Sequence, residues 1–299
     1  MKAVTVIELI DEVAGQLEAA GLSLADGFGQ GTLSAFDEAA WLVLWQIGLP
    51  LDDLDSVSKR AVTLTEYAQV ATLSGARIST RKPLAYLTRE AWLQGVPFYV
   101  DERAIIPRSL IAELIVDESI DAWLSDTTQR VLDLCTGNGS LAVLAAMAWP
   151  DIVIDAADIS LDALEVARIN IDRHGFDQRI TLIESDGLAA CSASYDLVLC
   201  NPPYVNARAM AALPPEFKAE PALALSGNSQ GGEDGMDFIR SLFLTAASHM
   251  SENAVVVLEI GNESTNFKRA FPELEPLWFE TSAGPDQVLL LTRQQLLSS

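Results

Sequence analysis

The sequence predicts an α/β fold: a mostly parallel sheet with helices on both faces, preceded by a smaller helical domain. Two observations support this prediction. From Arg130 onward, short apolar runs alternate with segments of helical periodicity, as expected for parallel strands joined by helices. Residues 1–80 show helical periodicity alone. The 299 residues, 49% hydrophobic and 20% charged, fit about two globular domains.

The N-terminal region predicts three helices. Apolar residues recur at helical spacing between Ile7 and Leu17 and make one apolar face. Asp37 stands where an N-cap is expected, ahead of a helix over residues 39–47. A third helical pattern covers residues 58–80. These helices carry no chemical motif, so we expect them to serve packing or partner recognition.

A change of pattern predicts a linker between two domains. Residues 92–107 contain a turn signal, an extended apolar run and a charged turn, which together predict a β-hairpin. A helix is expected over residues 109–124. We therefore place a helical domain at 1–90, a hairpin linker at 91–108 and the α/β domain at 109–299.

Within the α/β domain, the alternation gives a definite order of elements. Strands and helices are predicted in turn, and the C-terminal tail predicts an antiparallel pair at the sheet edge. The predicted strands are 130–135, 152–157, 180–184, 195–200 and 254–260, the helices are 139–148, 160–174 and 235–250, and the tail pair is 276–281 and 287–292.

Composition excludes several classes of function. The three cysteines are widely spaced and form no metal-type pair, and two histidines are too few for most metal or triad chemistry. The net charge of −23 repels phosphate backbones and favours basic partners, or it serves solubility alone. Acidic residues interrupt Met1–Ala20, and no run of about 18 apolar residues occurs, so we expect a cytoplasmic protein without a membrane segment.

A glycine-rich turn follows the first predicted strand, in the sequence Asp133-Leu-Cys-Thr136-Gly137-Asn138-Gly139-Ser140. Two glycines at this point let the backbone turn sharply and approach a ligand closely. The N–H groups of the next helix would point at that ligand. Alone the pattern is weak, because Gly137, Gly139 and Ala142 also fit a dinucleotide-binding fingerprint.

Acidic residues after the next two strands add a second signal. Asp158 lies nineteen residues after Gly139, where a carboxylate typically accepts hydrogen bonds from ribose hydroxyls. Asp155 is a weaker candidate because it lies inside the strand. Asp186 follows the third strand and is a candidate for the adenine amino group, or alternatively a helix N-cap.

The carboxylate of Asp133 favours one nucleotide over another. A dehydrogenase would place a pyrophosphate at the glycine-rich turn, and a carboxylate beneath the turn repels phosphate. The same carboxylate can bind the ammonium group of a methionine moiety. This favours S-adenosylmethionine over NAD as the cofactor.

The fourth strand runs into Asn201-Pro202-Pro203-Tyr204, at the edge where open α/β sheets bind ligands. An amide or aryl amine nitrogen is a poor nucleophile because its lone pair is delocalised. The side-chain carbonyl of Asn201 and the backbone carbonyl of Pro202 can grip its two N–H bonds and direct the lone pair at a methyl group. Tyr204 offers a flat face to a planar group, and positioning supplies most of the catalysis.

These motifs together resemble the class I methyltransferases that act on amide or exocyclic nitrogens, and the chain is most similar to the protein glutamine N5-methyltransferases. Further matching segments are Arg81–Leu87, Phe98–Arg103, Ile106–Ser109 with Glu113, and Glu220–Leu223 before Gly235. The segment Ala91–Arg103 is closer to the branch that methylates a large-subunit ribosomal protein. The release-factor branch usually has Pro-Arg-Pro where this chain has Pro107-Arg108-Ser109.

The resemblance implies a seven-stranded Rossmann-like sheet and a helical domain that recognises the substrate. It implies cofactor binding by Asp133, Gly137, Asp158 and Asn201, with Thr136, Asn138, Gly139 and Asp186 beside them. It implies acceptor binding by Asn201, Pro202, Pro203 and Tyr204, of which Asn201, Pro202 and Tyr204 are the catalytic candidates. Asn138 and Ser140 depart from the usual loop residues, and residues 1–35 match poorly.

Four functions follow for testing. The first is methylation of a glutamine in a basic ribosomal protein, and the second is methylation of a release factor. An adenine methyltransferase would need a basic groove, which the net charge opposes, so no direct DNA binding is expected. A non-enzymatic binding module would not need the intact tetrapeptide at 201–204.

Overall fold

The structure is a computed structural model that describes residues 4–24 and 27–298. It divides into two compact units. The helical unit comprises Met1–Ala91 and Leu213–Ala219, and the sheet unit comprises Trp92–Ala212 and Glu220–Ser299. The helical unit therefore includes a short segment that lies far along the chain and begins nine residues after Tyr204, the last residue of the tetrapeptide.

Three long helices build the helical unit, and their apolar faces share one core. Its helices are α1 (Val6–Ala19), α2 (Ala35–Gln46), α3 (Leu54–Val57), α4 (Leu64–Thr80), α5 (Leu84–Thr88) and α10 (Pro215–Lys218). Capping boxes start both α1 and α4: Thr5 pairs with Glu8, and Thr63 pairs with Glu66. Each box satisfies N–H groups that the first turn of a helix otherwise leaves without partners.

The predicted N-cap of the second helix was wrong. Ser34 caps α2, and its Oγ accepts a hydrogen bond from the backbone N–H of Asp37 at 3.1 Å. Asp37 lies instead in the first turn, where its negative charge favours the positive end of the helix dipole. The helix begins at Ala35 because the serine, three residues before Asp37, supplies the acceptor first.

A buried ion-pair cluster ties the segment Leu213–Ala219 into the helical unit. Arg77 is fully buried, and it donates to Glu38 at 2.7 Å, to Glu216 at 3.0 Å and to the carbonyl of Gly27 at 2.9 Å. Arg81 also binds Glu216, at 2.5 and 3.0 Å. These arginines hold the pKa of Glu216 below its usual value against the effect of burial.

Replacing Arg77 with methionine is expected to destabilise the helical unit by about 3–5 kcal/mol, because Glu38 would remain buried without its ion-pair partner and Glu216 would keep only Arg81. Urea unfolding followed by intrinsic tryptophan fluorescence, to which Trp41 and Trp45 of the helical unit contribute, measures the loss. Arg60→Met is the matched control, since Arg60 pairs with Glu66 at an exposed site and should contribute little to stability. Equal losses in the two variants would contradict the importance of the buried cluster.

The predicted hairpin is present but shorter than expected. Strands β1 (Ala91–Leu93) and β2 (Val96–Phe98) enclose a turn at Gln94 and Gly95, both with positive φ. Residues 99–107 continue as loop and turn. The single helix expected over 109–124 is also wrong: α6 covers only Ile111–Val116, and the 3₁₀ turn η1 covers Asp121–Trp123.

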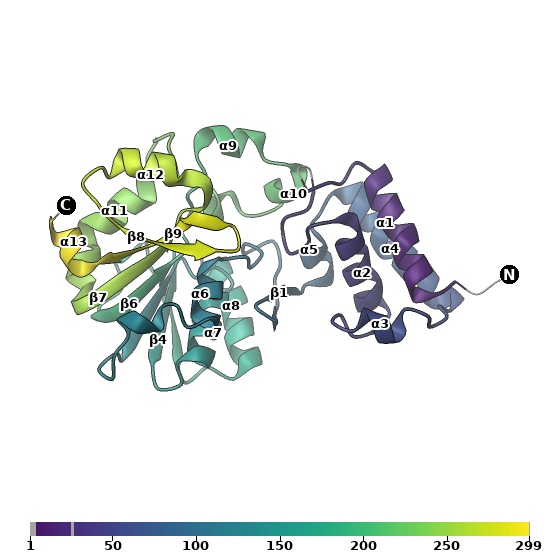
Figure 1. The fold of residues 1–299 in the computed structure, drawn as a ribbon, viewed down its shortest axis with the longest axis horizontal. Coiled ribbons are helices and arrows are strands. Elements are labelled where there is room, and N and C mark those ends of the chain that lie inside the picture. Colours follow the sequence, from purple (N-terminus) through teal and green to yellow (C-terminus); the bar gives the residue numbers. More distant parts are fainter. Residues whose placement is uncertain (1–3, 25–26, 299) are drawn as a thin grey trace. The chain divides into compact units, whose positions relative to one another are not determined.

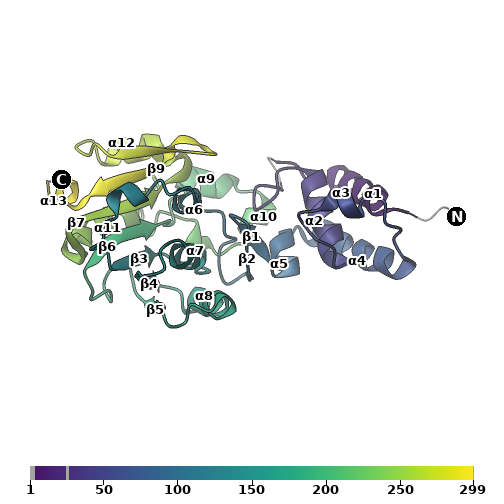
Figure 2. The same cartoon turned by 60° about the horizontal axis from the view of Figure 1, so that its bottom comes forward.

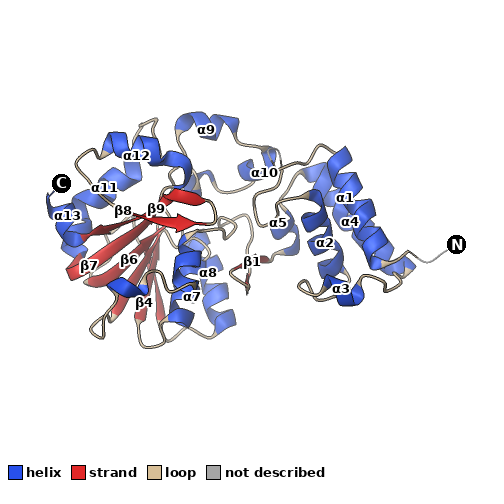
Figure 3. Cartoon of the chain, in the orientation of Figure 1, coloured by secondary structure: helices blue, strands red, loops and turns tan. Residues whose placement is uncertain are grey.

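Seven strands form the sheet of the second unit, in the order β5-β4-β3-β6-β7-β9-β8. The first five are parallel, and β9 is antiparallel to both β7 and β8. Figure 3 shows these strands in red with helices on the sheet's faces. The strands are β3 (Arg130–Leu134), β4 (Val153–Asp158), β5 (Ile180–Glu184), β6 (Tyr195–Cys200), β7 (Met250–Glu259), β8 (Leu277–Thr281) and β9 (Gly284–Thr292).

Alternate side chains of the strands bury two separate cores. Val131 and the side chains on its face of the sheet pack against α6, α7 and α8. Leu132 and the side chains on the other face pack against α11, α12 and α13 (Figures 1 and 2). The covering elements are α7 (Ser140–Ala148), α8 (Leu161–His174), α11 (Asp237–Ala246), η3 (Ala247–His249), η4 (Gly261–Glu263), α12 (Ser264–Ala270) and α13 (Arg293–Ser298). Along the chain, α9 (Ala207–Ala212), α10 and η2 (Ala222–Ala224) follow β6 and precede α11. This is the class I methyltransferase architecture that the sequence predicted.

The strand order reverses between β3 and β6. From β3 the chain builds outward to β4 and β5, then returns to add β6 and β7 on the other side. Both strands of the switch point run parallel, and Leu134 lies opposite Cys200. Open α/β sheets bind ligands outside the carboxyl ends of strands at such a point. The glycine-rich turn and the Asn201–Tyr204 tetrapeptide leave the sheet there side by side.

In the described part of the chain, no helix is long and apolar enough to cross a membrane. Across residues 4–24 and 27–298, no cluster of side chains has the composition to hold a metal ion. All three cysteines are free thiols. His174, the last residue of α8, contacts the carbonyl of Pro97 at 2.9 Å and packs against Phe98, so its role is to hold the hairpin.

Candidate active site

The glycine-rich turn requires both of its glycines. Gly137 and Gly139 have φ values of 56° and 78°, in the left-handed region. A Cβ atom on Gly139 would also lie 3.0 Å from the Cβ of Ala167 on α8. Cys135 shares the left-handed conformation with a φ of 61°, which is strained for a residue with a side chain. Such strain clusters at ligand sites.

Asp133 lies beneath this turn and is 1% exposed. Its Oδ2 accepts hydrogen bonds from Thr136 Oγ1 at 2.5 Å and from the backbone N–H of Ala142 at 3.0 Å. Its Oδ1 is buried and forms no hydrogen bond with the described residues. Burial raises the pKa of Asp133 to about 7, although the two donors act in the opposite direction. One oxygen of the carboxylate therefore remains for a ligand.

Asn138 supplies the complementary feature. Its Oδ1 accepts from the N–H of Ser140 at 3.1 Å, but its buried Nδ2 has no partner in the described chain. Buried polar atoms in native proteins almost always have partners, so an unpaired donor and an unpaired acceptor in one turn indicate a ligand with both functions. An α-amino acid has this pair, an ammonium and a carboxylate, and the residues present fit the methionine end of S-adenosylmethionine.

A residue that the sequence interpretation missed holds the turn in place. Asn170 of α8 is fully buried, and its Nδ2 donates to the carbonyls of Asn138 and Tyr99, each at 2.9 Å. Its Oδ1 accepts from the N–H of Tyr99 at 2.7 Å. Asn170 thus joins the glycine-rich turn to the loop after the hairpin. An asparagine on the apolar side of a predicted helix was the available signal.

Asp158, the last residue of β4, faces the same turn. Its Oδ2 accepts from the N–H of Gly137 and its Oδ1 from the N–H of Ser160, both at 2.9 Å. Burial raises its pKa, and these backbone donors oppose the rise. Each oxygen retains capacity for a further hydrogen bond. Asp155 lies within β4 and binds Tyr195 and Arg130, so it does not join the site.

The tetrapeptide begins where β6 ends. Pro202 is buried, and Asn201, Pro203 and Tyr204 are partly exposed. Within residues 4–24 and 27–298, neither the Asn201 side chain nor the Pro202 carbonyl forms a hydrogen bond. Two carbonyl acceptors thus remain available beside the cofactor turn. This arrangement can bind both N–H groups of a primary amide.

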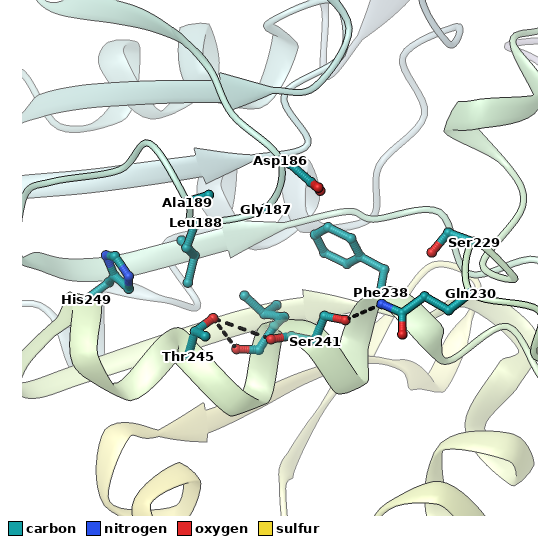
Figure 4. Close-up of a pocket in the computed structure, with 11 residues that line it drawn as sticks. Asp186, Gly187, Leu188, Ala189, Ser229, Gln230, Phe238, Ser241, Thr245 and His249 are labelled. Carbon is teal, nitrogen blue, oxygen red and sulfur yellow. Dashed lines mark hydrogen bonds between the residues drawn. The ribbon is translucent and has the colours of Figure 1, made fainter.

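Asp186 lies two residues after Glu184, the ladder partner of Asp158. It is exposed and lines a cavity of about 300 Å³ between the turn after β5 and helix α11 (Figure 4). Gln230 donates to Ser241 at this cavity, at 2.7 Å, and Phe238 points into it. Residues 187–190 form a turn, so Asp186 does not cap a helix. The lining of this cavity includes none of Asp133, Gly137 or Asn201.

The structure brings together Asp133, the turn Thr136–Gly139, Asp158 and Asn201–Tyr204 at the carboxyl ends of β4, β3 and β6. Two contributors were missed, Asn170 and Glu259. Glu259 ends β7 and accepts a hydrogen bond from the Tyr204 hydroxyl at 3.2 Å. Its signal in the sequence is a lone carboxylate in the apolar run Ala254–Ile260.

Comparison with known proteins agrees with this geometry. The family model described as Methyltransferase small domain matches residues 114–228. Among solved structures, the hMettl16 catalytic domain in complex with MAT2A 3'UTR hairpin 6 superimposes with a TM-score of 0.50. The match covers 78% of this chain and 84% of that one, at 13% sequence identity. At that identity the likeness shows a shared fold alone.

Much closer relatives cover nearly the whole chain. Ribosomal protein uL3 glutamine methyltransferase of Bordetella pertussis is 47% identical over 98% of this chain and 96% of its own. The proteins of the same name from Burkholderia pseudomallei (43% identical; 98% and 95%) and Neisseria meningitidis serogroup A (44%; 90% and 88%) agree. The chain is therefore a methyltransferase that belongs to the family of ribosomal protein uL3 glutamine methyltransferases.

Proposed function

We propose that this enzyme methylates the side-chain amide nitrogen of a glutamine in ribosomal protein uL3, with S-adenosylmethionine as the methyl donor. The observation that carries the proposal is the pair of unengaged carbonyls, on Asn201 and Pro202, beside a turn with an unpaired carboxylate oxygen. Relatives that share 42–47% of the sequence carry the name of this activity.

Each residue at the cofactor turn has a proposed role. Asp133 Oδ1 takes the ammonium of the methionine moiety, and Asn138 Nδ2 takes its carboxylate. Asp158 accepts from the ribose hydroxyls, as an acidic residue at the end of the second strand typically does. Asp186 is the candidate for the adenine amino group. The bound cofactor supplies a methyl group on a sulfonium, which is already activated for transfer.

The tetrapeptide activates the acceptor by geometry. Asn201 Oδ1 and the Pro202 carbonyl accept the two N–H bonds of the glutamine amide and draw its nitrogen toward tetrahedral geometry. The lone pair then leaves conjugation and points at the methyl group. Holding two reactants in this arrangement is the main source of acceleration. The amide proton is lost after transfer, when the nitrogen is strongly acidic, so the site needs no strong base.

The net charge supports a basic protein as the partner. A charge of −23 favours association with a positively charged protein and opposes binding to nucleic acid. We assign acceptor recognition to the helical unit, which carries no catalytic motif. Peptide release factors are the alternative acceptor, and the assay that follows distinguishes them.

Incubation with labelled S-adenosylmethionine and three acceptors tests the proposal: uL3 lacking the modification, a release factor and DNA. Label is expected on uL3, and mass spectrometry should place one methyl group on a glutamine. Replacing that glutamine with glutamate should abolish labelling, which provides the matched control. Label on the release factor alone would identify the release factor, and not uL3, as the substrate. Label on DNA alone would overturn the proposal.

A further inference from the structure

The hydroxyl of Tyr204 contacts the end of the neighbouring strand. It donates to Glu259 Oε1 at 3.2 Å. Glu259 is the last residue of β7 and is 3% exposed. Cys200 and Leu258 are partners in the parallel ladder, so the tetrapeptide and Glu259 leave the sheet as neighbours. A buried carboxylate thus lies directly behind the aromatic residue of the site.

Glu259 is itself held firmly. Its second oxygen, Oε2, accepts from Ser109 Oγ at 2.6 Å and from the N–H of Leu110 at 2.9 Å. Three donors, including the Tyr204 hydroxyl, therefore converge on one carboxylate. Hydrogen bonds to an ionised acceptor are shorter and stronger than those between neutral groups. Ser109 and Leu110 therefore fix the side chain of Glu259 independently of its contact with Tyr204.

The backbone after β7 supports the ring of Tyr204 on another side. A Cβ atom on Gly261 would lie 2.6 Å from a ring carbon of Tyr204 and 3.0 Å from its hydroxyl oxygen. Gly261 also has a φ of 50°. The ring therefore rests against a backbone that tolerates no side chain, while Glu259 holds its tip. Together these contacts define one orientation of the ring.

We propose that Glu259 is a positioning residue for methyl transfer: it fixes the plane of the Tyr204 ring and thereby the plane of the acceptor amide. This inference rests on the proposed function, in which Tyr204 lies against that amide. A ring free to rotate would let the amide tilt away from the two carbonyls of Asn201 and Pro202. Small displacements of this kind cost large factors in rate.

A double-mutant cycle tests the coupling, with Tyr204→Phe, Glu259→Gln and their combination. Tyr204→Phe keeps the ring and loses the hydrogen bond. Each single variant is expected to lower kcat by about tenfold to a hundredfold. The Kd for S-adenosylhomocysteine and the KM for uL3 should change by less than about threefold. The double variant should lose less than the product of the two single losses, because both changes act on the same Tyr204–Glu259 contact.

Tyr195→Phe is the matched control. Tyr195 is buried in the same sheet and donates to a buried carboxylate, Asp155, at 2.9 Å. This variant should lower the Tm about as much as Tyr204→Phe while leaving kcat unchanged. If the losses in kcat multiply in the double variant, or if Tyr195→Phe slows turnover equally, Glu259 has only a structural role and the inference is overturned.

A measurement that needs no turnover separates this inference from the proposed function. Protein labelled with ¹³C in its five tyrosine rings gives resonances that Tyr204→Phe and Tyr195→Phe assign. Glu259→Gln should broaden or split the Tyr204 signals and leave those of Tyr195 unchanged. Unchanged Tyr204 signals would overturn the inference. Absence of transfer by the wild-type enzyme to any acceptor would instead overturn the proposed function, and the ring signals would still decide whether Glu259 fixes Tyr204.

Discussion

Replacing Asn201 with alanine is expected to lower kcat for uL3 methylation by about a hundredfold to a thousandfold. The estimate follows from the loss of one fixed polar group that acts on the reacting atoms. The variant keeps the Pro202 carbonyl but loses the other acceptor for the amide N–H groups. Because Asn201 has no hydrogen bond with the described residues, its removal leaves no buried partner unpaired. Single-turnover kinetics measures the effect directly.

Two further measurements make this prediction specific. The Kd for S-adenosylhomocysteine should weaken at most modestly, because Asp133 and the turn Thr136–Gly139 are unchanged. Pro202→Ala should lower kcat less than Asn201→Ala, since the carbonyl that it contributes belongs to the backbone. Turnover near the wild-type value in Asn201→Ala would refute the assigned role of the asparagine.

The sheet could be predicted well because its central strands β3, β4 and β6 are mostly buried and its edge strand β5 is short and bounded by turns. The bounds predicted for the strands at 180–184 and 195–200 match β5 and β6. Their apolar runs are short, lie between turn signals and carry no competing helical period. The strand predicted at 254–260 begins earlier in the structure, at Met250, because Met250 pairs with Tyr195 of β6 ahead of a register shift in the ladder.

Local signals failed in two places. The helix predicted over 109–124 stops at Val116, and Glu118 adopts a φ of 63°. The segment Leu213–Ala219 belongs to the helical unit because Glu216 is buried against Arg77 and Arg81, about 135 residues away along the chain. No periodicity or turn signal encodes such a pairing.

The candidate site was likewise predicted only in part. Motifs identified the turn Asp133–Gly139, Asp158 and Asn201–Tyr204, since each follows a predictable strand and parallel strands end at one edge. Glu259 and Asn170 were missed because their roles depend on what they contact. A buried glutamate in an apolar strand is informative only once the ladder places Leu258 opposite Cys200.

Replacing Asp133 with asparagine is expected to weaken S-adenosylhomocysteine binding by about a hundredfold to a thousandfold. The amide oxygen can still accept from Thr136 and Ala142, as Oδ2 does now. The amide nitrogen then replaces the unpaired Oδ1 and presents N–H groups to an ammonium. The buried attraction becomes a repulsion between donors. Isothermal titration calorimetry measures the loss.

The same substitution should stabilise the ligand-free protein at pH 8. Burial raises the pKa of Asp133 from 3.8 to about 7, so the folded state binds its proton more tightly than the unfolded state does. Stability is therefore lost as pH rises from about 4 to about 7, and the full penalty remains above that range. Asparagine removes a penalty on the order of 4 kcal/mol. The gain in Tm should shrink as the pH falls toward 4.

Binding by the wild-type enzyme should weaken below about pH 7 for the same reason, by up to tenfold per pH unit, because protonated Asp133 has lost its charge. In Asp133→Asn, binding should no longer weaken in this way as the pH falls. Any pH dependence of binding that remains is assigned to Asp158, because burial raises its pKa too. A variant that binds S-adenosylhomocysteine like wild type, or that is less stable at pH 8, would contradict the role assigned to Asp133. Weaker binding together with higher stability would mean that the free enzyme retains a destabilising buried carboxylate because the ligand requires it.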